Sequence, residues 1–171
     1  MKFICNLVLV IWDLTNLILK KILLNQLEFC KLHVGEYPRK EDKMPKINLT
    51  PASLGTPIAP FVPGTKRGSF VFTSGQVALD KAGNLVGQGD VGTQTRQVLQ
   101  NIKAVLEEGG AMLGDVMKTT VFLADIKDFS AMNEVYADFF GDLKPARSTV
   151  QAALARPEFL VEIEAIAIIA D

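Results

Sequence analysis

Cysteine, histidine and tryptophan are absent from most of this chain. Of its 171 residues, both cysteines (Cys5 and Cys30), the single histidine (His33) and the single tryptophan (Trp12) lie before Met44. From Met44 onward the chain therefore offers no thiol nucleophile, no Ser-His-Asp triad, no zinc site with nitrogen or sulfur ligands and no disulfide. Any catalysis in that part must use carboxylate, hydroxyl, amide, Arg, Lys or Tyr groups.

The same part of the chain also lacks an excess of positive charge. Residues 44–171 carry 11 Lys and Arg against 14 Asp and Glu, with no basic cluster. Proteins that bind a phosphate backbone depend on such clusters, so no nucleic-acid partner is expected. With 49% hydrophobic and 22% charged residues overall, the composition is typical of an ordinary globular domain.

Residues 1–43 differ in composition from the rest and are predicted to be a separate segment, an apolar extension followed by a polar linker. Phe3–Trp12 is an uncharged run that Asp13 interrupts, and a charge at the centre of a spanning helix costs about 2.5–3.5 kcal/mol. Three interpretations stay open. The segment is an appendage absent from the mature protein, with Met44 as the true start; it is a membrane-associated or targeting helix; or it is a structural helix docked on the domain.

The first interpretation predicts a cytoplasmic protein with no membrane contact. If residues 1–43 are genuine, a mitochondrial or membrane-associated location stays open. A cleavable presequence is disfavoured, because the segment contains no Ser and only one Arg, Arg39. The domain from residue 44 to residue 171 is predicted to be independent of this question.

Hydrophobic periodicity in residues 44–171 predicts strands and helices in alternation. Strands are expected around Ile47–Leu49, Ser69–Thr73 and Met117–Leu123, with a rigid, unpaired, proline-rich loop between the first two. Asp90 and Asp128 are placed to cap two amphipathic helices. This order predicts an α+β fold, a sandwich in which two helices pack on one face of a mixed sheet.

The other face of that sheet needs a cover. Thr119, Val121 and Ala152 are expected to line part of it. An apolar face without a covering layer in its own chain suggests that further subunits supply one.

Two runs near the end, RSTVQAALA and LVEIEAIAI, alternate with period two and flank Pro157 and Glu158. This pattern predicts an antiparallel hairpin. Glu162 would then lie opposite about residue 153, roughly 20 Å from Arg147 at about 3.3 Å per residue. We therefore expect these two residues not to share a small substrate within one chain.

Several polar residues are candidates for a site. Arg147, beside a Pro-Ala turn, suits a bidentate contact to a carboxylate or phosphate, or a surface salt bridge. Glu162 suits a general base, or a solvated strand face shared with Glu164. Ser74-Gly75 suits a backbone anion site or a strand-ending turn, and Asn133 suits ligand orientation or loop bridging. Each residue alone leaves both interpretations open.

Four segments taken together resemble the YjgF-type family, also called the reactive-intermediate deaminase (RidA) family. The resemblance covers residues 46–169 and none of the first 43. It implies a chorismate-mutase-like α+β fold, assembled as a homotrimer with its sites in the clefts between subunits. The segments that carry it are TSGQVAL (73–79), QTRQVLQNIKAVLEEGGAMLGDVMKTTVFLADIKDF (94–129), NEVYADFF (133–140) and PARSTVQAALA…VEIEAIAI (145–168).

The resemblance implies a 2-iminobutanoate/2-iminopropanoate deaminase that works without cofactor or metal. Such an enzyme hydrolyses reactive 2-imino and enamine acids, among them 2-aminoacrylate and 2-iminopropanoate, to the 2-oxo acid and ammonia. Arg147 falls on the family's carboxylate-binding arginine and Glu162 on its water-activating glutamate. Substrate-binding pocket positions of the family fall on Ser74, Gly75, Asn133 and Thr149.

One pocket position departs from the family pattern. The family usually has Tyr in a PYV segment, where this chain has Pro60-Phe61-Val62. Phe61 therefore keeps open a non-catalytic metabolite-binding module of the same fold. A third alternative, RNA cleavage or translation inhibition, is also associated with the family. It is disfavoured by the acidic balance of residues 44–171 and by the absence of histidine there.

Overall fold

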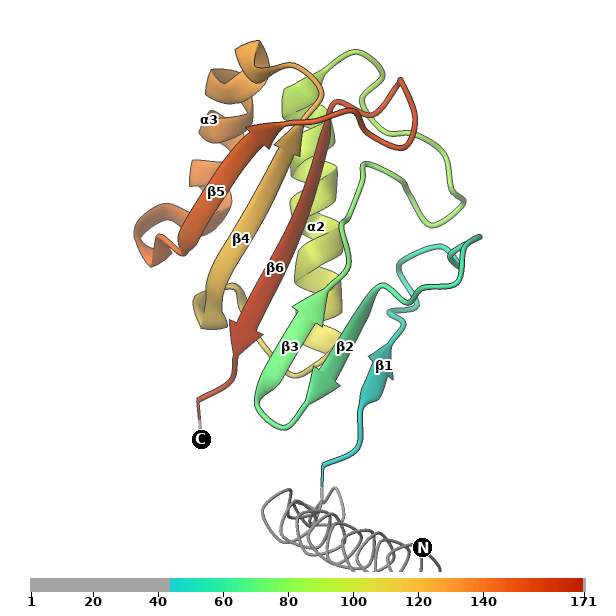
Figure 1. Ribbon diagram of the computed structural model, residues 1–171, viewed down its shortest axis with the longest axis vertical. Coiled ribbons are helices and arrows are strands. Elements are labelled where there is room, and N and C mark those ends of the chain that lie inside the picture. The colour runs from blue at the N-terminus through green and yellow to red at the C-terminus, as the bar shows by residue number, and fades with distance from the viewer. Residues whose placement is uncertain (1–43, 171) are drawn as a thin grey trace, which may run out of the picture. The chain divides into compact units, whose positions relative to one another are not determined.

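The structure is a computed structural model, and it describes residues 44–170 (Figure 1). The chain separates into two units, Met1–Lys43 and Met44–Asp171, and only the second is described here. The predictions made above for residues 1–43 lie outside the described residues. Within residues 44–170, no helix is long and apolar enough to cross a membrane.

Six strands form one mixed sheet, in the order β1-β2-β3-β6-β4-β5. All neighbouring pairs are antiparallel except β4 and β5, which run parallel. The strands are β1 (Ile47–Leu49), β2 (Gly64–Arg67), β3 (Phe70–Thr73), β4 (Val116–Leu123), β5 (Ala146–Gln151) and β6 (Val161–Ile168).

Two helices, α2 (Val91–Glu108) and α3 (Phe129–Phe140), cover one face of this sheet (Figure 1). The α+β architecture predicted from the sequence is confirmed. Three short 3-10 turns precede β4, α3 and β5: Leu113–Asp115, Ile126–Asp128 and Gly141–Leu143. The core lies between helices and sheet, where α2 and α3 bury the apolar residues that recur at helical spacing.

Asp90 begins α2 as the sequence predicts. Its carboxylate accepts hydrogen bonds from the backbone N–H groups of Gly92 and Thr93, which satisfies two of the free donors at the helix start. The corresponding prediction for α3 is wrong, because Asp128 makes no side-chain capping bond. The carboxylate that does cap here is Asp125, which accepts from the N–H of Lys127 in the preceding 3-10 turn.

The predicted hairpin between the last two strands is also wrong. β5 and β6 do not pair with each other, because β4 lies between them and pairs with both. Alternation with period two identifies which residues share a face of a strand, but it does not identify the neighbouring strand. The connection after Gln151 instead crosses over β4.

Two further expectations need correction. Thr119 and Val121 do not line the uncovered face; both are fully buried on the helix side of β4. The loop between β1 and β3 is also not wholly unpaired, because Gly64–Arg67 forms β2. With only four residues and no apolar alternation, β2 leaves no strand signal in the sequence.

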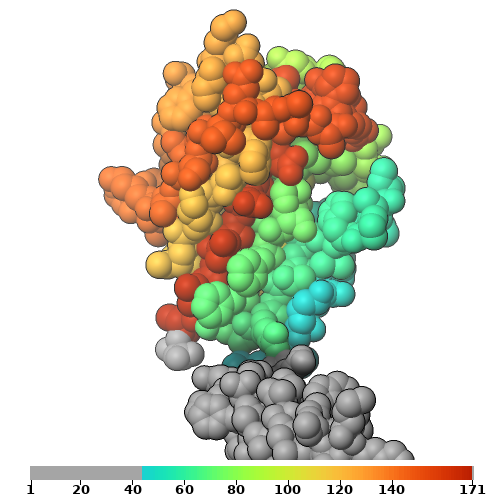
Figure 2. Space-filling model, in the orientation of Figure 1, coloured from blue at the N-terminus to red at the C-terminus, as the bar shows by residue number. Residues whose placement is uncertain are grey.

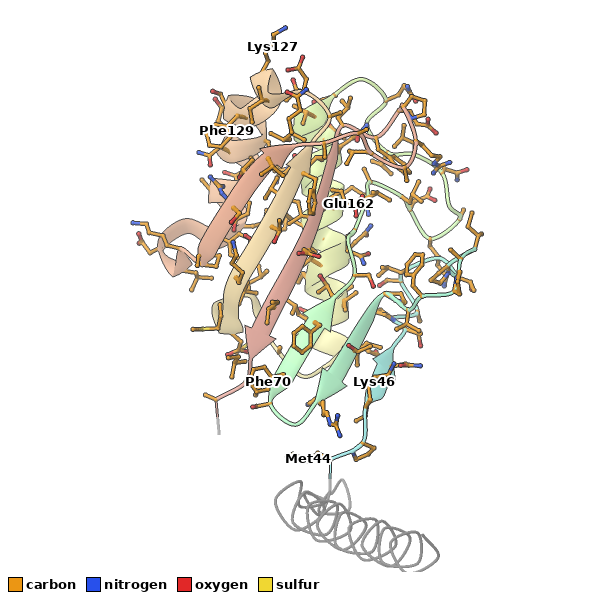
Figure 3. All side chains as sticks on the ribbon, in the orientation of Figure 1. Met44, Lys46, Phe70, Lys127, Phe129 and Glu162 are labelled. Carbon is orange, nitrogen blue, oxygen red and sulfur yellow. The ribbon has the colours of Figure 1, made fainter. Side chains whose placement is uncertain are left out.

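The face of the sheet opposite the helices is bare within the described chain (Figure 2). Several large apolar side chains are exposed on it, and β4, β5 and β6 add polar groups between them. Exposed apolar residues on strands include Phe70, Phe72, Val150 and Ile168. Figure 3 shows Phe70 and Glu162 on this face, which we call the open face.

Candidate functional site

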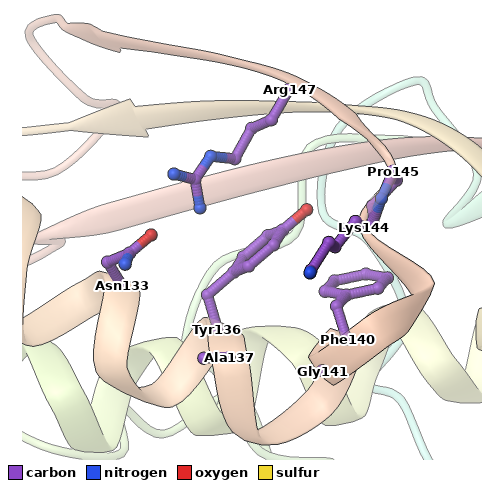
Figure 4. Close-up of a pocket in the computed structure, with 8 residues that line it drawn as sticks. All are labelled: Asn133, Tyr136, Ala137, Phe140, Gly141, Lys144, Pro145 and Arg147. Carbon is purple, nitrogen blue, oxygen red and sulfur yellow. The ribbon is translucent and has the colours of Figure 1, made fainter.

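Arg147 extends from β5 toward α3, on the helix-covered side of the sheet (Figure 4). Its guanidinium carbon lies 4.5 Å from the ring centroid of Tyr136 and 5.6 Å from that of Phe129. The side chain of Arg147 forms no hydrogen bond or ion pair with any residue in the described range. The surface salt bridge considered as an alternative for Arg147 is therefore absent from residues 44–170.

A cavity of about 430 Å³ opens beside this guanidinium. Because its lining contains no carboxylate, the positive charge of Arg147 stays available to an anionic ligand. Tyr136, Ala137 and Phe140 make much of the remaining wall apolar. The residues that line it are Asn133, Tyr136, Ala137, Phe140, Gly141, Lys144, Pro145 and Arg147.

Asn133 and Arg147, both predicted as site residues, thus share one cavity. Thr149 is two residues beyond Arg147 on β5 and therefore projects from the same face of the strand. It does not line the cavity, but its Oγ1 is buried without a hydrogen-bond partner among the described residues. Thr149 therefore carries an unused donor and acceptor on the strand that holds Arg147. Leaving a buried hydroxyl without a partner costs stability.

Glu162 lies on the open face (Figure 3). Glu162 alternates along β6 with the buried residues 161, 163, 165 and 167, and it pairs with Phe122 of the neighbouring strand β4. Burial raises the pKa of its carboxyl group, and the nearby charge of Glu164 raises it further. Both effects disfavour the ionised form and bring the carboxyl group toward the range useful for a general base.

Gly75 packs directly against the Glu162 carboxylate. A Cβ atom at position 75 would overlap Oε1 of Glu162 and approach its Cδ to 2.8 Å. Gly75 therefore allows the backbone after β3 to approach the carboxylate closely. Two of the predicted site residues meet at this point.

Ser74 and Phe61 belong to the same region, through the loop before β2. The Ser74 hydroxyl donates to the carbonyl of Val62 at 2.6 Å, and the Ser74 N–H donates to the carbonyl of Pro63 at 2.8 Å. Both donors of Ser74 are thus engaged in holding the loop. Phe61, next to Val62, is 52% exposed and has no hydroxyl to contribute.

The predicted residues therefore form two groups on opposite faces of the sheet. Arg147 pairs with Thr119 of β4, whereas Glu162 pairs with Phe122. The two positions are about 10 Å apart along the strands and about 10 Å apart across them, and their side chains point to opposite sides. The separation of about 20 Å predicted from the hairpin register is wrong, because β5 and β6 do not pair. Within one chain the two side chains are nevertheless kept apart, because they lie on opposite faces of the sheet.

Two cavity residues escape identification from sequence alone. Tyr136 looks like one more member of the apolar stripe of α3, and Lys144 like a loop lysine. Asn133 and Tyr136 are three residues apart, which places both on one helix face, and this spacing is the available signal. Lys144 takes a left-handed backbone conformation at φ 40°, which sequence patterns do not reveal for a lysine. Among the described residues, no cluster of three or more His, Cys, Asp or Glu is arranged to hold a metal ion.

This arrangement, a mixed sheet with two helices on one face, defines the chorismate-mutase-like class of α+β fold. Within that class, residues 52–169 match the family model described as Endoribonuclease L-PSP. The chain belongs to this family, also known as the YjgF/RutC family.

Individual relatives agree with that membership. A RutC family protein of Pyrococcus horikoshii is 52% identical over 112 residues, which are 65% of this chain and 88% of the relative. The crystal structure of Escherichia coli TdcF with bound serine matches with a TM-score of 0.67 at 38% identity and covers 72% of this chain and 99% of that one. The YjgF gene product of E. coli matches with a TM-score of 0.66 at 37% identity and covers 71% and 98%.

Proposed function

We propose that this protein is a cofactor-free deaminase that hydrolyses reactive 2-imino acids and their enamine tautomers to 2-oxo acids and ammonia. The observation that carries the proposal is the Arg147 guanidinium. This group faces a cavity and has no ion-pair partner in the described chain. A planar cation in that setting suits bidentate binding of a carboxylate. The serine bound to the related TdcF supports an amino-acid-like ligand for the family.

In the proposed mechanism Arg147 binds the substrate carboxylate and fixes the position of the imine carbon. Asn133, in the same cavity, contributes amide donors and an acceptor that orient the ligand. Water attacks the carbon of the protonated imine while Glu162 accepts a proton from it, which gives a neutral carbinolamine. Glu162 then returns this proton to the nitrogen and the C–N bond breaks as ammonia leaves. The hydroxyl proton passes to Glu162 as the carbonyl forms, and from there to ammonia, which departs as ammonium.

The electronic demands of this reaction fit the residues present. The C=N bond is already electrophilic, so the step needs a carboxylate base and a positioned substrate. The raised pKa of Glu162 suits a base that must take up a proton and release it again. Phe61 in place of the family's usual tyrosine removes a hydroxyl, and we expect it to slow turnover or shift the preferred substrate.

The site also requires an oligomer in this proposal. Because Arg147 and Glu162 lie on opposite faces of the sheet, one chain cannot present both to one small substrate. We propose that they meet across the interface of a homotrimer. The exposed apolar side chains of the open face support this, since a monomer rarely exposes so many on one face.

Arg147→Ala tests the proposed function. With 2-aminoacrylate supplied by a serine dehydratase, we expect this variant to lose 2-oxo acid release by at least about 100-fold, because the carboxylate contact that orients the imine is gone. Its oligomeric state should remain that of the wild type. A matched control is Arg96→Ala, which removes an exposed arginine paired with Asp138 on the helix side and should leave the rate unchanged.

Unchanged turnover in Arg147→Ala would contradict the proposal. Binding of a 2-oxo acid by the wild type without any release of product from the imine would instead indicate a metabolite-binding module of the same fold.

A further inference from the structure

Tyr136 lies beneath the guanidinium of Arg147, where its ring can determine the position of that group (Figure 4). It is the single tyrosine in residues 44–171. The ring centroid is 4.5 Å from the Arg147 guanidinium carbon, closer than the 5.6 Å of Phe129. At such distances the negative face of an aromatic ring attracts a cation.

The Tyr136 ring is itself held on two sides. Its hydroxyl forms a 2.7 Å hydrogen bond with the hydroxyl of Thr119, which is fully buried on β4. On α3, the Phe140 ring packs against it at 4.5 Å between centroids. The sheet and the helix therefore both fix the ring, and Tyr136 is 7% exposed.

A buried tyrosine needs a partner for its hydroxyl in any protein, so the bond to Thr119 alone indicates only good packing. Arg147 provides the second observation. Its guanidinium makes no hydrogen bond or ion pair with residues 44–170, and it lies over the rings of Tyr136 and Phe129. All of its N–H donors thus remain available while its plane is kept in place beside the cavity.

The charge balance of the pair is consistent with this arrangement. Burial raises the pKa of Tyr136, against the opposing effects of the Thr119 hydrogen bond and the Arg147 charge. The phenol therefore stays neutral over the physiological range. A neutral ring orients the cation and leaves its charge intact. An acidic residue at this position would neutralise that charge.

We propose that Tyr136 is a positioning residue, whose ring, anchored to Thr119, holds the Arg147 guanidinium in the orientation that binds a ligand carboxylate. The proposal deepens the proposed function and rests on it in one respect, namely that the ligand carries a carboxylate. Tyr136 contributes to ligand binding through Arg147 and takes no part in proton transfer.

Tyr136→Leu tests this role by removing the ring. We expect the dissociation constant for 2-oxobutanoate, measured by calorimetry on the intact protein, to rise about tenfold. Without the ring, part of the binding free energy is used to order the Arg147 side chain. With the imine as substrate, KM should rise by a similar factor while kcat changes less than about threefold. Phe159→Leu is the matched control, since Phe159 is a buried ring beneath Arg156 and away from the cavity. It should lower thermal stability without changing either constant.

Tyr136→Phe separates the ring from its hydroxyl. It keeps the aromatic face and should keep 2-oxobutanoate affinity within about threefold of the wild type. Tyr136→Phe leaves the buried Thr119 hydroxyl without its partner. The double variant Tyr136→Phe, Thr119→Val removes that hydroxyl as well and should recover stability. If Tyr136→Leu does not fold, Tyr136→Met replaces the ring with a flexible side chain of adequate volume and carries the same expectation.

The outcomes distinguish this proposal from the proposed function. Wild-type protein that binds 2-oxobutanoate but releases no product from imines would contradict the deaminase, while a tenfold loss of binding in Tyr136→Leu would still support the positioning role. Three results would overturn the positioning role of Tyr136. These are unchanged binding in Tyr136→Leu, a loss of binding in Tyr136→Phe as large as in Tyr136→Leu, and no carboxylate binding by the wild type.

Discussion

Arg147 and Glu162 depend on opposite kinds of environment. Arg147 lies over two aromatic rings that leave its charge uncompensated in the described chain, whereas the partial burial of Glu162 and the neighbouring Glu164 carboxylate both disfavour the ionised form of Glu162. An unpaired cation attracts an anionic ligand, and a carboxylate with a raised pKa exchanges protons closer to neutral pH. Each residue is thus suited to the role proposed for it.

Glu164→Gln is expected to extend activity to lower pH. Removing the Glu164 charge takes away one of the two causes that raise the pKa of Glu162, so Glu162 stays ionised in more acidic solution. The acid limb of kcat/KM against pH should move to lower pH, while the plateau changes little. Glu107→Gln, which removes an exposed carboxylate on α2, should leave the profile in place. An acid limb that does not move in Glu164→Gln would contradict this account.

The same raised pKa has a consequence for stability. A carboxyl group whose pKa is higher in the folded than in the unfolded state contributes stability fully below its unfolded value, and that contribution is lost as the pH rises through the folded value. Glu162→Gln, compared with wild type by thermal unfolding, should therefore be relatively more stable at neutral pH than at pH 4. Glu162→Gln should nevertheless be inactive. This result would indicate that the Glu162 carboxylate is retained for function although it lowers stability at neutral pH.

Sequence reasoning at this scale identifies residue types but not their surroundings. The chemistry of Arg147, Glu162 and Asn133 is visible in the sequence. The engagement of both Ser74 donors by the loop carbonyls of Val62 and Pro63 is not, because it depends on a contact between β3 and the loop before β2. Tyr136 is missed for a similar reason, since its partner Thr119 is 17 residues away on β4.

At the scale of single elements, local signals predict well where the interaction is local. The Asp90 cap depends on neighbours two and three residues away and is confirmed. The pairing of β5 and β6 depends on which strand lies between them, and the sequence carries no local record of that choice. The faces of Thr119 and Val121 were predicted wrongly because alternation does not say which of the two faces is covered.

Asp90→Ala should destabilise the domain more than Asp128→Ala. Asp90 caps α2 through two backbone N–H groups and also accepts from the Thr93 hydroxyl at 2.6 Å, whereas Asp128 makes no capping bond. These hydrogen bonds lower the pKa of Asp90, so its contribution is present above its unfolded value and is lost as the pH falls through the folded value. Denaturant unfolding at pH 7 and pH 3 checks both points. Equal midpoints for the two variants at pH 7 would show that the Asp90 cap does not contribute.

At the scale of the whole molecule, the two faces of the sheet divide the proposed chemistry. The helix side holds Arg147, Asn133 and the cavity, and the open face holds Glu162 with Gly75. The open face also exposes apolar side chains that a partner would cover. In the proposed homotrimer each chain gives Arg147 to one site and Glu162 to another, so catalysis requires assembly.

Mixing two inactive variants tests this claim most directly. Arg147→Ala and Glu162→Gln each lack one half of every site, so neither alone should release 2-oxo acid. When the two are unfolded together in equal amounts and reassembled, random pairing should restore about a quarter of the wild-type sites, with mixed trimers identified by native mass spectrometry. Recovery near that level is the predicted result. Mixed oligomers that stay inactive would contradict a site shared between subunits.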